Sequence, residues 1–318
     1  MGLSRLDHRP ELDGNKRSAD GNSALDADNS GAHDNVQAVN AVPLDLPRST
    51  RLELPGRGTI NVRYFGPSDA DTTILLLHGW TATADLNWFR CYAALGQQFR
   101  VVAYDHRGHG AGLRSKKRFR LEDCADDAVA VADELGIQEF VPVGYSMGGP
   151  VAQLIWRRHR ERVLGLVLCA TAPVFSVERL ERLSFLGASG LAALARITPE
   201  QARLWLTDQF FLQRKAREWD PWAVEEASGH DWRMLLEAGT AIGAFDSTPW
   251  ISNVDVPTSL VVTMRDQTVS KRRQTLLFDA LPDAEVYRID GDHDAVVEEA
   301  DQFSPALVRA ISSVHART

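Results

Sequence analysis

Short, continuous apolar runs recur along the chain from about residue 72 onward, and most of them end in a polar or glycine-rich segment. A run of this kind buries side chains on both faces of a sheet and is typical of a strand in a parallel sheet. We predict such strands at Thr72–Leu77, Val101–Tyr104, Phe140–Val143, Val163–Leu168, Thr258–Met264 and Glu285–Ile289. Before them, Arg51–Leu54 and Ile60–Phe65 flank Pro55-Gly56-Arg57-Gly58, a pattern that predicts a hairpin.

Stretches with helical periodicity lie between these strands. We predict helices over 84–96, 121–135, 147–156, 270–281 and 301–315. The second of these is closed by Gly136, a residue type that commonly follows a helix end. Strands that alternate with helices form a mainly parallel sheet with right-handed crossovers. The predicted fold class is therefore α/β, with a mainly parallel sheet flanked by helices.

One segment, residues 174–248, interrupts the alternation because its pattern is helical throughout. The predicted helices cover 177–186, 191–195 and 200–211, with further pieces as far as Phe245. The segment holds half of the chain's eight tryptophans, namely Trp205, Trp219, Trp222 and Trp232. Any one of them can simply pack against the core, but together they indicate an apolar surface.

The first 47 residues are rich in Asp, Asn, Ser, Gly and Ala and nearly free of aromatic residues. Such a composition cannot bury enough apolar surface to fold alone, so we predict a disordered tail over 1–47. The α/β core is predicted over 48–173 and 249–318.

Composition narrows the classes of function. The chain has 318 residues, 44% of them hydrophobic, and a formal net charge of −8, which argues against nucleic-acid binding. Cys91, Cys124 and Cys169 are widely spaced, so no disulfide framework or metal site is predicted and a cytoplasmic location is expected. Met1–Pro10 lacks the apolar centre of a signal peptide. Val163–Phe175 is too short to span a bilayer, so no transmembrane segment is expected.

The motif Gly144-Tyr145-Ser146-Met147-Gly148 stands between a predicted strand and a predicted helix. A serine on so tight a turn is held in a strained backbone conformation with its hydroxyl clear of the sheet. Gly144 and Gly148 are expected because neighbouring backbone passes close by. Five residues of this pattern can also form an ordinary glycine-rich turn. The flanking strand and helix favour a nucleophile, Ser146.

Further motifs follow the other predicted strands, and together they resemble the α/β-hydrolase superfamily, in particular its esterase, lipase and acyl-hydrolase members. The resemblance covers roughly residues 50–315. It rests on His78-Gly79-Trp80, Asp105-His106-Arg107-Gly108-His109-Gly110, Gly144-Tyr145-Ser146-Met147-Gly148-Gly149, Asp266 and Gly291-Asp292-His293. It implies that segment 174–248 forms a cap over the active site, and that Asp105 and Arg107 shape the loop beneath it.

A serine hydroxyl needs a base, and the resemblance implies that His293 is that base. His293 follows the last predicted strand, in a loop that can reach back to Ser146, although a surface histidine flanked by acids is the alternative. The family order of serine, acid and histidine points to Asp266, which ends an apolar strand. Asp292 and Asp294 are rival acids by proximity.

The resemblance also implies an oxyanion hole formed by the backbone N–H groups of Trp80 and Met147, with the Trp80 ring lining the acyl pocket. A purely structural role for Trp80 remains an alternative. Lys116, Lys117, Arg118 and Arg120 form a basic run. For these cations we favour a solvated loop over a patch for an anionic substrate or lipid head group.

These residues predict a serine hydrolase that cleaves a carboxylic ester, or a related acyl bond, of a small apolar substrate through an acyl-enzyme. No metal or organic cofactor is implied. Alternatives on the same scaffold are a carbon–carbon bond hydrolase, an acyltransferase, a cofactor-free oxygenase or perhydrolase, and a non-catalytic ligand sensor. Haloalkane dehalogenases and epoxide hydrolases place an aspartate where Ser146 stands, which argues against both.

Overall fold

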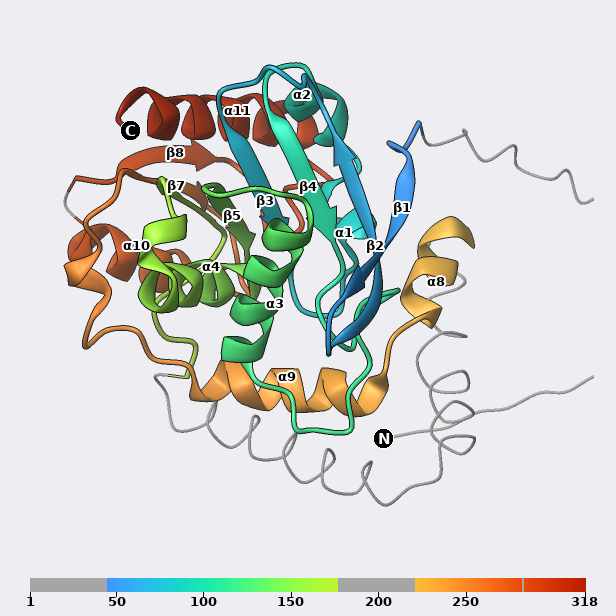
Figure 1. Ribbon diagram of the computed structural model, residues 1–318. Coiled ribbons are helices and arrows are strands. Elements are labelled where there is room, and N and C mark those ends of the chain that lie inside the picture. The colour runs from blue at the N-terminus through green and yellow to red at the C-terminus, as the bar shows by residue number, and fades with distance from the viewer. Residues whose placement is uncertain (1–44, 177–220, 282) are drawn as a thin grey trace, which may run out of the picture. The chain divides into compact units, whose positions relative to one another are not determined.

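The computed structural model describes residues 45–176, 221–281 and 283–318 (Figure 1). The predicted tail, apart from its last three residues, therefore lies outside the described residues. So do Trp205 and Trp219 and the predicted helices over 177–186, 191–195 and 200–211.

Eight strands form one sheet in the order β1-β2-β4-β3-β5-β6-β7-β8. Their bounds are β1 Ser49–Leu54, β2 Gly58–Phe65, β3 Thr73–Leu77, β4 Arg100–Tyr104, β5 Val141–Tyr145, β6 Leu166–Cys169, β7 Thr258–Thr263 and β8 Glu285–Ile289. Neighbouring strands from β4 across to β8 are parallel, whereas β2 pairs antiparallel with both β1 and β4. The predicted α/β class with a mainly parallel sheet is confirmed, as is the hairpin.

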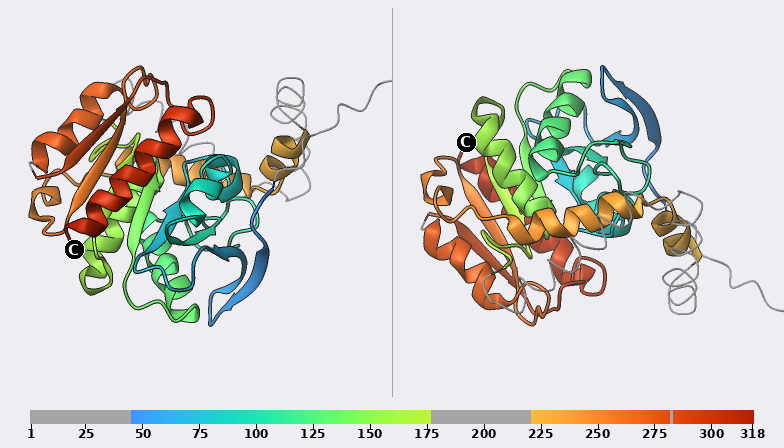
Figure 2. Two further views of the ribbon diagram at one scale, coloured as in Figure 1. Left: turned by 90° about the horizontal axis from the view of Figure 1, so that it is seen from above. Right: turned by 90° about the horizontal axis from the view of Figure 1, so that it is seen from below.

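Helices cover both faces of the sheet (Figures 1 and 2). The described helices are α1 Ala84–Trp88, α2 Tyr92–Gly96, α3 Leu121–Glu134, α4 Gly148–Arg158, α8 Pro221–Ser228, α9 Trp232–Ala244, α10 Lys271–Ala280 and α11 Ala300–Ala316, with short 3-10 turns η1 Arg160–Arg162 and η3 Ile251–Asn253. Helix α3 ends just before Gly136, whose φ of +70° explains the choice of glycine there.

One predicted helix is different in the structure. The stretch 84–96 forms two short helices, α1 and α2, instead of one. The chain closes a tight turn between them, in which the Cys91 N–H donates to the Trp88 carbonyl at 2.8 Å. The side chains of Trp88 and Cys91 are fully buried, so the turn still contributes to the hydrophobic core.

The burial of β3 explains its continuous apolar sequence. Leu75 and Leu77 belong to the core on one face of the sheet, which includes residues of α3, α4, α9 and α10. Ile74 and Leu76 belong to the core on the other face, which includes residues of α1, α2 and α11. Because successive side chains alternate across a strand, a strand covered on both faces favours apolar residues at successive positions.

The strand order has a topological switch point between β3 and β5. From β3 the chain moves outward to β4 on one side and then returns to β5 on the other. In open α/β sheets the carboxyl ends of the strands diverge at such a switch point and leave a ligand-binding crevice there. The segments after β3 and β5, which begin at His78 and Ser146, flank this point.

Among the described residues, no helix is long and apolar enough to cross a membrane.

Candidate active site

The turn between β5 and α4 has the strain that its sequence predicts. Ser146 has a φ of +51°, which is uncommon for a residue other than glycine. A Cβ on Gly144 would lie 2.2 Å from the Gly148 carbonyl oxygen, and a Cβ on Gly148 would lie 2.1 Å from the Leu77 carbonyl oxygen. Only glycine fits at either position, so the predicted close approach of backbone is confirmed.

The loop after β8 brings a histidine ring to this serine. The His293 Nε2 lies 2.9 Å from the Ser146 Oγ, and the His293 Nδ1 lies 2.8 Å from the Asp266 Oδ2. Strands β7 and β8 are neighbours, so the loops that carry Asp266 and His293 leave the same edge of the sheet. The structure therefore joins all three predicted residues in one hydrogen-bonded chain.

The carboxylate of Asp266 is buried, and each of its oxygens has further donors. Oδ1 accepts from the backbone N–H groups of Thr268 at 2.9 Å and Val269 at 2.7 Å. Oδ2 accepts from the Thr263 hydroxyl at 2.7 Å and from the Gln274 amide at 3.2 Å. These contacts hold the carboxylate in one orientation toward His293. The sequence analysis did not identify Thr263 or Gln274, because a polar residue at a strand end or in a helix has many other roles.

The two rival acids do not contact the ring. The Asp292 Oδ1 accepts instead from the backbone N–H groups of Gln267 at 3.0 Å and His293 at 2.7 Å. These N–H groups, that of Gln267 first, hold the pKa of Asp292 below its ordinary value. Asp294 is exposed. Asp292 thus fastens the loop backbone beside Asp266.

Tyr145, the residue directly before Ser146, is a further support for the His293 loop that the sequence did not reveal. Its hydroxyl donates to the carbonyl of His293 at 2.6 Å, and its ring lies 5.8 Å from the imidazole. The ring also packs edge-on against Trp88 and Phe303, so it is fixed within the core. The signal available in the sequence was only that a large aromatic residue stands at this place in the motif.

Of the predicted oxyanion donors, Met147 directly follows Ser146, and Trp80 directly follows a residue that contacts the turn. A Cβ on Gly79 would lie 3.4 Å from the Ser146 Cβ, so the loop after β3 contacts the turn. The Gly79 N–H donates to the Asn87 side chain at 2.9 Å. Within the described residues, the N–H groups of Trp80 and Met147 have no hydrogen-bond acceptor. Two free N–H groups close to a serine can bind an oxyanion.

The indole of Trp80 is directed to α9. Its Nε1 donates to the Leu235 carbonyl at 2.9 Å, and a Cβ on Gly239 would lie 2.8 Å from the ring. Trp80 is nonetheless 38% exposed. Trp80 therefore has a structural contact with α9 in addition to any role in lining a pocket.

The described part of the predicted cap consists of α8 and α9. Helix α9 runs across one end of the sheet (Figure 1) and buries Met234, Leu235 and Ala238. Its Glu237 accepts from the Phe119 N–H at 2.8 Å and pairs with Arg233 at 3.2 Å. The ring of Trp222 lies 5.4 Å from that of Phe89. The contacts of Glu237 with Phe119 and of Trp222 with Phe89 are made to segments that follow β4 and β3.

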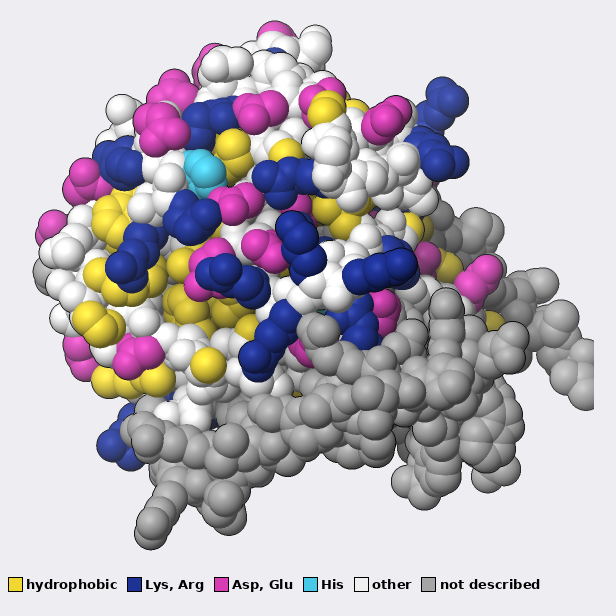
Figure 3. All heavy atoms as spheres, turned by 60° about the horizontal axis from the view of Figure 1, so that its bottom comes forward, with side chains coloured by type: hydrophobic (Ala, Val, Ile, Leu, Met, Phe, Trp, Pro, Cys, Tyr) yellow, Lys and Arg dark blue, Asp and Glu magenta, His cyan; other side chains and the backbone are white. Residues whose placement is uncertain are grey.

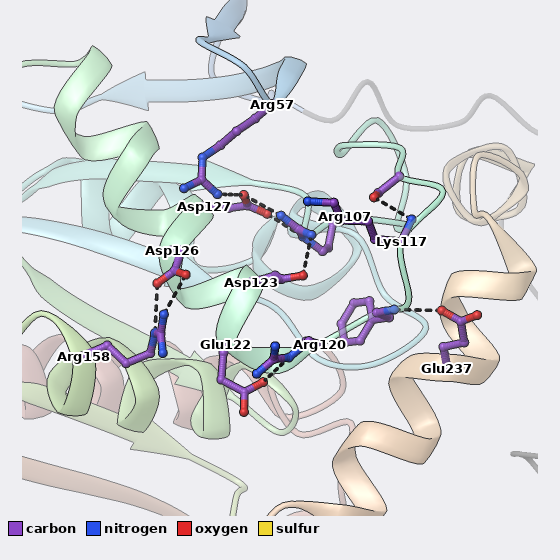
Figure 4. A network of polar contacts seen from close by, with 12 residues as sticks. Arg57, Arg107, Lys117, Arg120, Glu122, Asp123, Asp126, Asp127, Arg158 and Glu237 are labelled. Carbon is purple, nitrogen blue, oxygen red and sulfur yellow. Dashed lines mark hydrogen bonds and ion pairs between the residues drawn. The ribbon is translucent and has the colours of Figure 1, made fainter.

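The motif after β4 is structural. Arg107 forms two hydrogen bonds to Asp127, at 2.7 and 2.8 Å, and one to Asp123 at 3.0 Å (Figure 4). Asp105 accepts from the N–H groups of Ala84 and Ala111. Burial is the main reason that the pKa of Asp105 rises to about 6. The motif therefore fastens its loop to α3 and to α1, as the resemblance implies.

The basic run is exposed, and its surroundings contain many carboxylates. Figure 3 shows Lys and Arg side chains interspersed with Asp and Glu side chains on the face that it draws. Arg120 lies 3.4 Å from Glu122, and nearby Arg158 pairs with Asp126 at 2.8 Å (Figure 4). This mixture of signs fits a solvated surface better than an anion-binding patch.

In the part of the chain that the structure describes, no three His, Cys, Asp or Glu side chains are arranged to hold a metal ion. The three cysteines are free thiols, and all are buried. Burial raises the pKa of the Cys91 thiol to about 12.

Comparisons with known proteins agree with the fold. A family model described as "alpha/beta hydrolase fold" matches residues 72–300. A protein of Agrobacterium fabrum, named for the carbamate hydrolase RutD, is 27% identical over 252 residues, which span 77% of this chain and 95% of that protein. The 3-oxoadipate enol-lactonase 2 of Acinetobacter baylyi is 24% identical over 255 residues, or 78% of this chain and 91% of the enzyme. A solved hydrolase of Pseudomonas aeruginosa has a TM-score of 0.69 at 19% identity, covers 83% of this chain and 98% of its own, and shows the fold alone.

Proposed function

This chain belongs to the α/β-hydrolase family and is a hydrolase, and we propose that it cleaves a carboxylic ester or related acyl bond through a serine acyl-enzyme. The observation that carries the proposal is the hydrogen-bonded chain of Ser146, His293 and Asp266, with contacts of 2.9 and 2.8 Å.

The geometry assigns each residue a role. The Asp266 carboxylate accepts a hydrogen bond from the Nδ1–H of His293, which leaves the lone pair of Nε2 directed at the Ser146 hydroxyl. Ser146 attacks the substrate carbonyl as its proton moves to Nε2, and His293 then donates that proton to the leaving group. Water, activated by the same imidazole, releases the acid and restores the serine.

Charge that develops on the carbonyl oxygen needs fixed donors. The free N–H groups of Trp80 and Met147 are the donors that we propose, because both lie next to residues that contact the Ser146 turn. Met147 also directly precedes α4, where the helix dipole favours negative charge.

Two considerations support an acyl bond as the target. One relative is named for carbamate hydrolysis and another for enol-lactone hydrolysis, and in both substrates a nucleophile can attack a carbonyl carbon. The site as described has the parts that such an attack requires and no aspartate nucleophile. For the substrate itself we propose a small, apolar molecule, since segment 174–248, which we propose as a cap, is rich in tryptophan.

The test is covalent labelling with a fluorophosphonate, combined with multiple turnover of a short p-nitrophenyl ester. Ser146→Ala should abolish both labelling and turnover, because neither His293 nor Asp266 can replace the serine hydroxyl as the nucleophile. Ser252→Ala, which alters an exposed serine, is the matched control and should keep both. Labelling that persists in Ser146→Ala would place the nucleophile elsewhere. Stoichiometric labelling without turnover would favour a ligand sensor.

A further inference from the structure

The loop that carries the proposed oxyanion donor Trp80 has a strained residue next to it. Thr81 has a φ of +62°, a genuine outlier for a β-branched side chain, and its hydroxyl donates to the Trp80 carbonyl at 2.6 Å. A strained conformation persists only where its surroundings hold it. The neighbours of Thr81 must therefore maintain the shape of this loop.

A histidine from a distant part of the chain supplies one such contact. His230 lies between α8 and α9 and is 4% exposed. Its Nδ1 lies 3.0 Å from the Gly110 N, and its Nε2 lies 3.2 Å from the Thr81 carbonyl oxygen.

These two contacts assign the proton of the ring. The Gly110 N–H is a donor, so the His230 Nδ1 must accept and carries no proton. The proton is therefore on Nε2, which donates it to the Thr81 carbonyl. Both bonds are made at once only by this neutral tautomer.

The backbone around His230 is itself anchored to the loop after β4. The Asp231 N–H donates to the Gly108 carbonyl at 2.8 Å, and the Arg114 guanidinium bonds the carbonyls of Gly110 and Gly229. A Cβ on Gly108 would lie 2.4 Å from the Met234 Cβ, so this loop lies directly against α9. The backbone that carries His230 is therefore fixed relative to the loop after β4.

We propose that His230 is a positioning residue, whose neutral ring holds the Thr81 carbonyl so that the Trp80 N–H stays aimed at the developing oxyanion. The inference rests on the proposed function, because it gives His230 a part in that reaction only through Trp80. Without the bond, Thr81 can relax toward negative φ. That rotation moves the Trp80–Thr81 peptide and, through it, the adjoining Gly79–Trp80 peptide that carries the Trp80 N–H.

The surroundings keep the ring neutral. The ring of His109, in the loop after β4, lies 5.5 Å from the His230 ring. The ring of Trp232, at the start of α9, lies 6.1 Å from the His230 ring. Arg114 is the nearby cation, Asp231 is adjacent in sequence, and His78 also interacts electrostatically with the site. Burial first, and Arg114 after it, lower the pKa of His230 to about 4, so the required tautomer persists at neutral pH.

Two substitutions separate the two hydrogen bonds. The amide of His230→Gln has the length to place an N–H near the position of Nε2 and so keep the Thr81 bond. The shorter amide of His230→Asn reaches the position of Nδ1, keeps the Gly110 bond and loses Thr81. We expect His230→Asn to lower kcat by about 10- to 100-fold with KM little changed, since complete loss of an oxyanion donor costs about 100- to 1000-fold. His230→Gln should keep most of kcat.

Melting temperature and a Ser146→Ala control accompany these measurements. A purely structural role predicts that kcat follows melting temperature in both variants, and that result would overturn the inference. So would wild-type kcat in His230→Asn. If wild type shows no turnover that depends on Ser146, the proposed function is wrong. If turnover depends on Ser146 but His230→Asn leaves kcat unchanged, only the positioning role of His230 is wrong.

If His230→Asn does not fold, the acid limb of kcat gives the answer. Wild type should show an additional loss of kcat as the pH falls toward about 4. A protonated Nδ1 would face the Gly110 N–H donor to donor, and the repulsion would displace the ring from the Thr81 carbonyl. His230→Gln has no such proton and should lack that added slope. Identical acid limbs in the two proteins would refute the inference.

Discussion

Asp266 differs from the acids beside His293 in what its carboxylate contacts. It is the acid that bonds the ring, and Thr263, Gln274 and two backbone N–H groups orient it. A carboxylate held in this way accepts only and cannot rotate away, so it selects one tautomer of the imidazole. This selection is the property that a substitution can test.

Asp266→Asn should lower kcat by about 10⁴-fold, or about 5.4 kcal/mol at 1.36 kcal/mol per decade. The amide can hold the imidazole in the wrong tautomer, with a protonated nitrogen turned to Ser146. Since an amide N–H₂ would also face a donor such as Gln274, a stability loss of about 1–3 kcal/mol is expected. Steady-state kinetics, on protein shown by circular dichroism to be folded, provides the measurement.

Asp292→Asn is the matched control. A single oxygen of Asp292 accepts both of its backbone N–H bonds, and an amide oxygen can keep them. This variant should therefore lose far less activity than Asp266→Asn. The opposite ranking would show that the third residue of the chain is misassigned.

At the scale of elements, one carboxylate of α3, that of Asp127, contacts both the loop after β4 and the β1–β2 hairpin. Asp127 bonds Arg107 through two nitrogens, and it also bonds Arg57 from the hairpin at 2.7 Å (Figure 4). The side chains of Asp127 and Arg107 are 4% and 9% exposed, so water does not screen their attraction. Removal of the Asp127 charge would leave the buried Arg107 guanidinium with a single bond, to the more exposed Asp123.

Asp127→Asn should lower the free energy of unfolding by about 3 kcal/mol or more, as expected when one partner of a buried ion pair is removed. The control is Asp133→Asn on the same helix, because Asp133 is 57% exposed in its pair with Arg162. An exposed pair contributes about 0–1 kcal/mol. Urea denaturation of both variants measures the difference, and equal losses would contradict the structural role of Arg107.

At the scale of the whole molecule, four buried histidines from three loops lie together beside the site. We call His78, His106, His109 and His230 the histidine cluster. Neighbouring rings are 4.5 Å apart for His78 and His106, 5.0 Å for His78 and His109, and 5.5 Å for His109 and His230. Burial is the leading cause that lowers each pKa, to about 3 for His106, to about 4 for His230 and well below the ordinary value for the other two. The folded protein therefore keeps all four neutral.

This cluster predicts a loss of stability in mild acid. The folded pKa values lie below the unfolded value of about 6.5, so the stability is complete above that pH and falls as the pH falls toward the folded values. Each histidine should reduce the free energy of unfolding by about 1.4 kcal/mol per pH unit below pH 6.5. At pH 5.5, unfolding should be accompanied by the uptake of roughly four protons, about one for each histidine of the cluster.

Denaturant unfolding between pH 5 and pH 7 measures that slope. In the described structure neither ring nitrogen of His106 has a hydrogen-bond partner, so His106→Phe should reduce the proton uptake by about one without a stability loss at pH 7. A slope unchanged by His106→Phe would mean that His106 is not held neutral.

The sequence by itself determined most of the described strands and helices and the strained turn at Ser146. The apolar runs of β3 to β7 predict buried strands, because a strand covered on both faces carries mostly apolar side chains. The glycines of the turn at Ser146 predict its strain, because the atoms that would clash with a Cβ lie within a few residues or on the adjoining strand. These are local or pairwise constraints that residue types alone express.

Only the tertiary structure decided which acid meets His293 and what supports the site. Asp266 and His293 are joined because β7 and β8 are neighbours, whereas sequence distance favours Asp292 and Asp294. The Tyr145 hydroxyl reaches a carbonyl 148 residues away, and His230 reaches one 149 residues away. Hydrogen bonds at such separations depend on strand order and loop packing, and no period or motif along the chain encodes them.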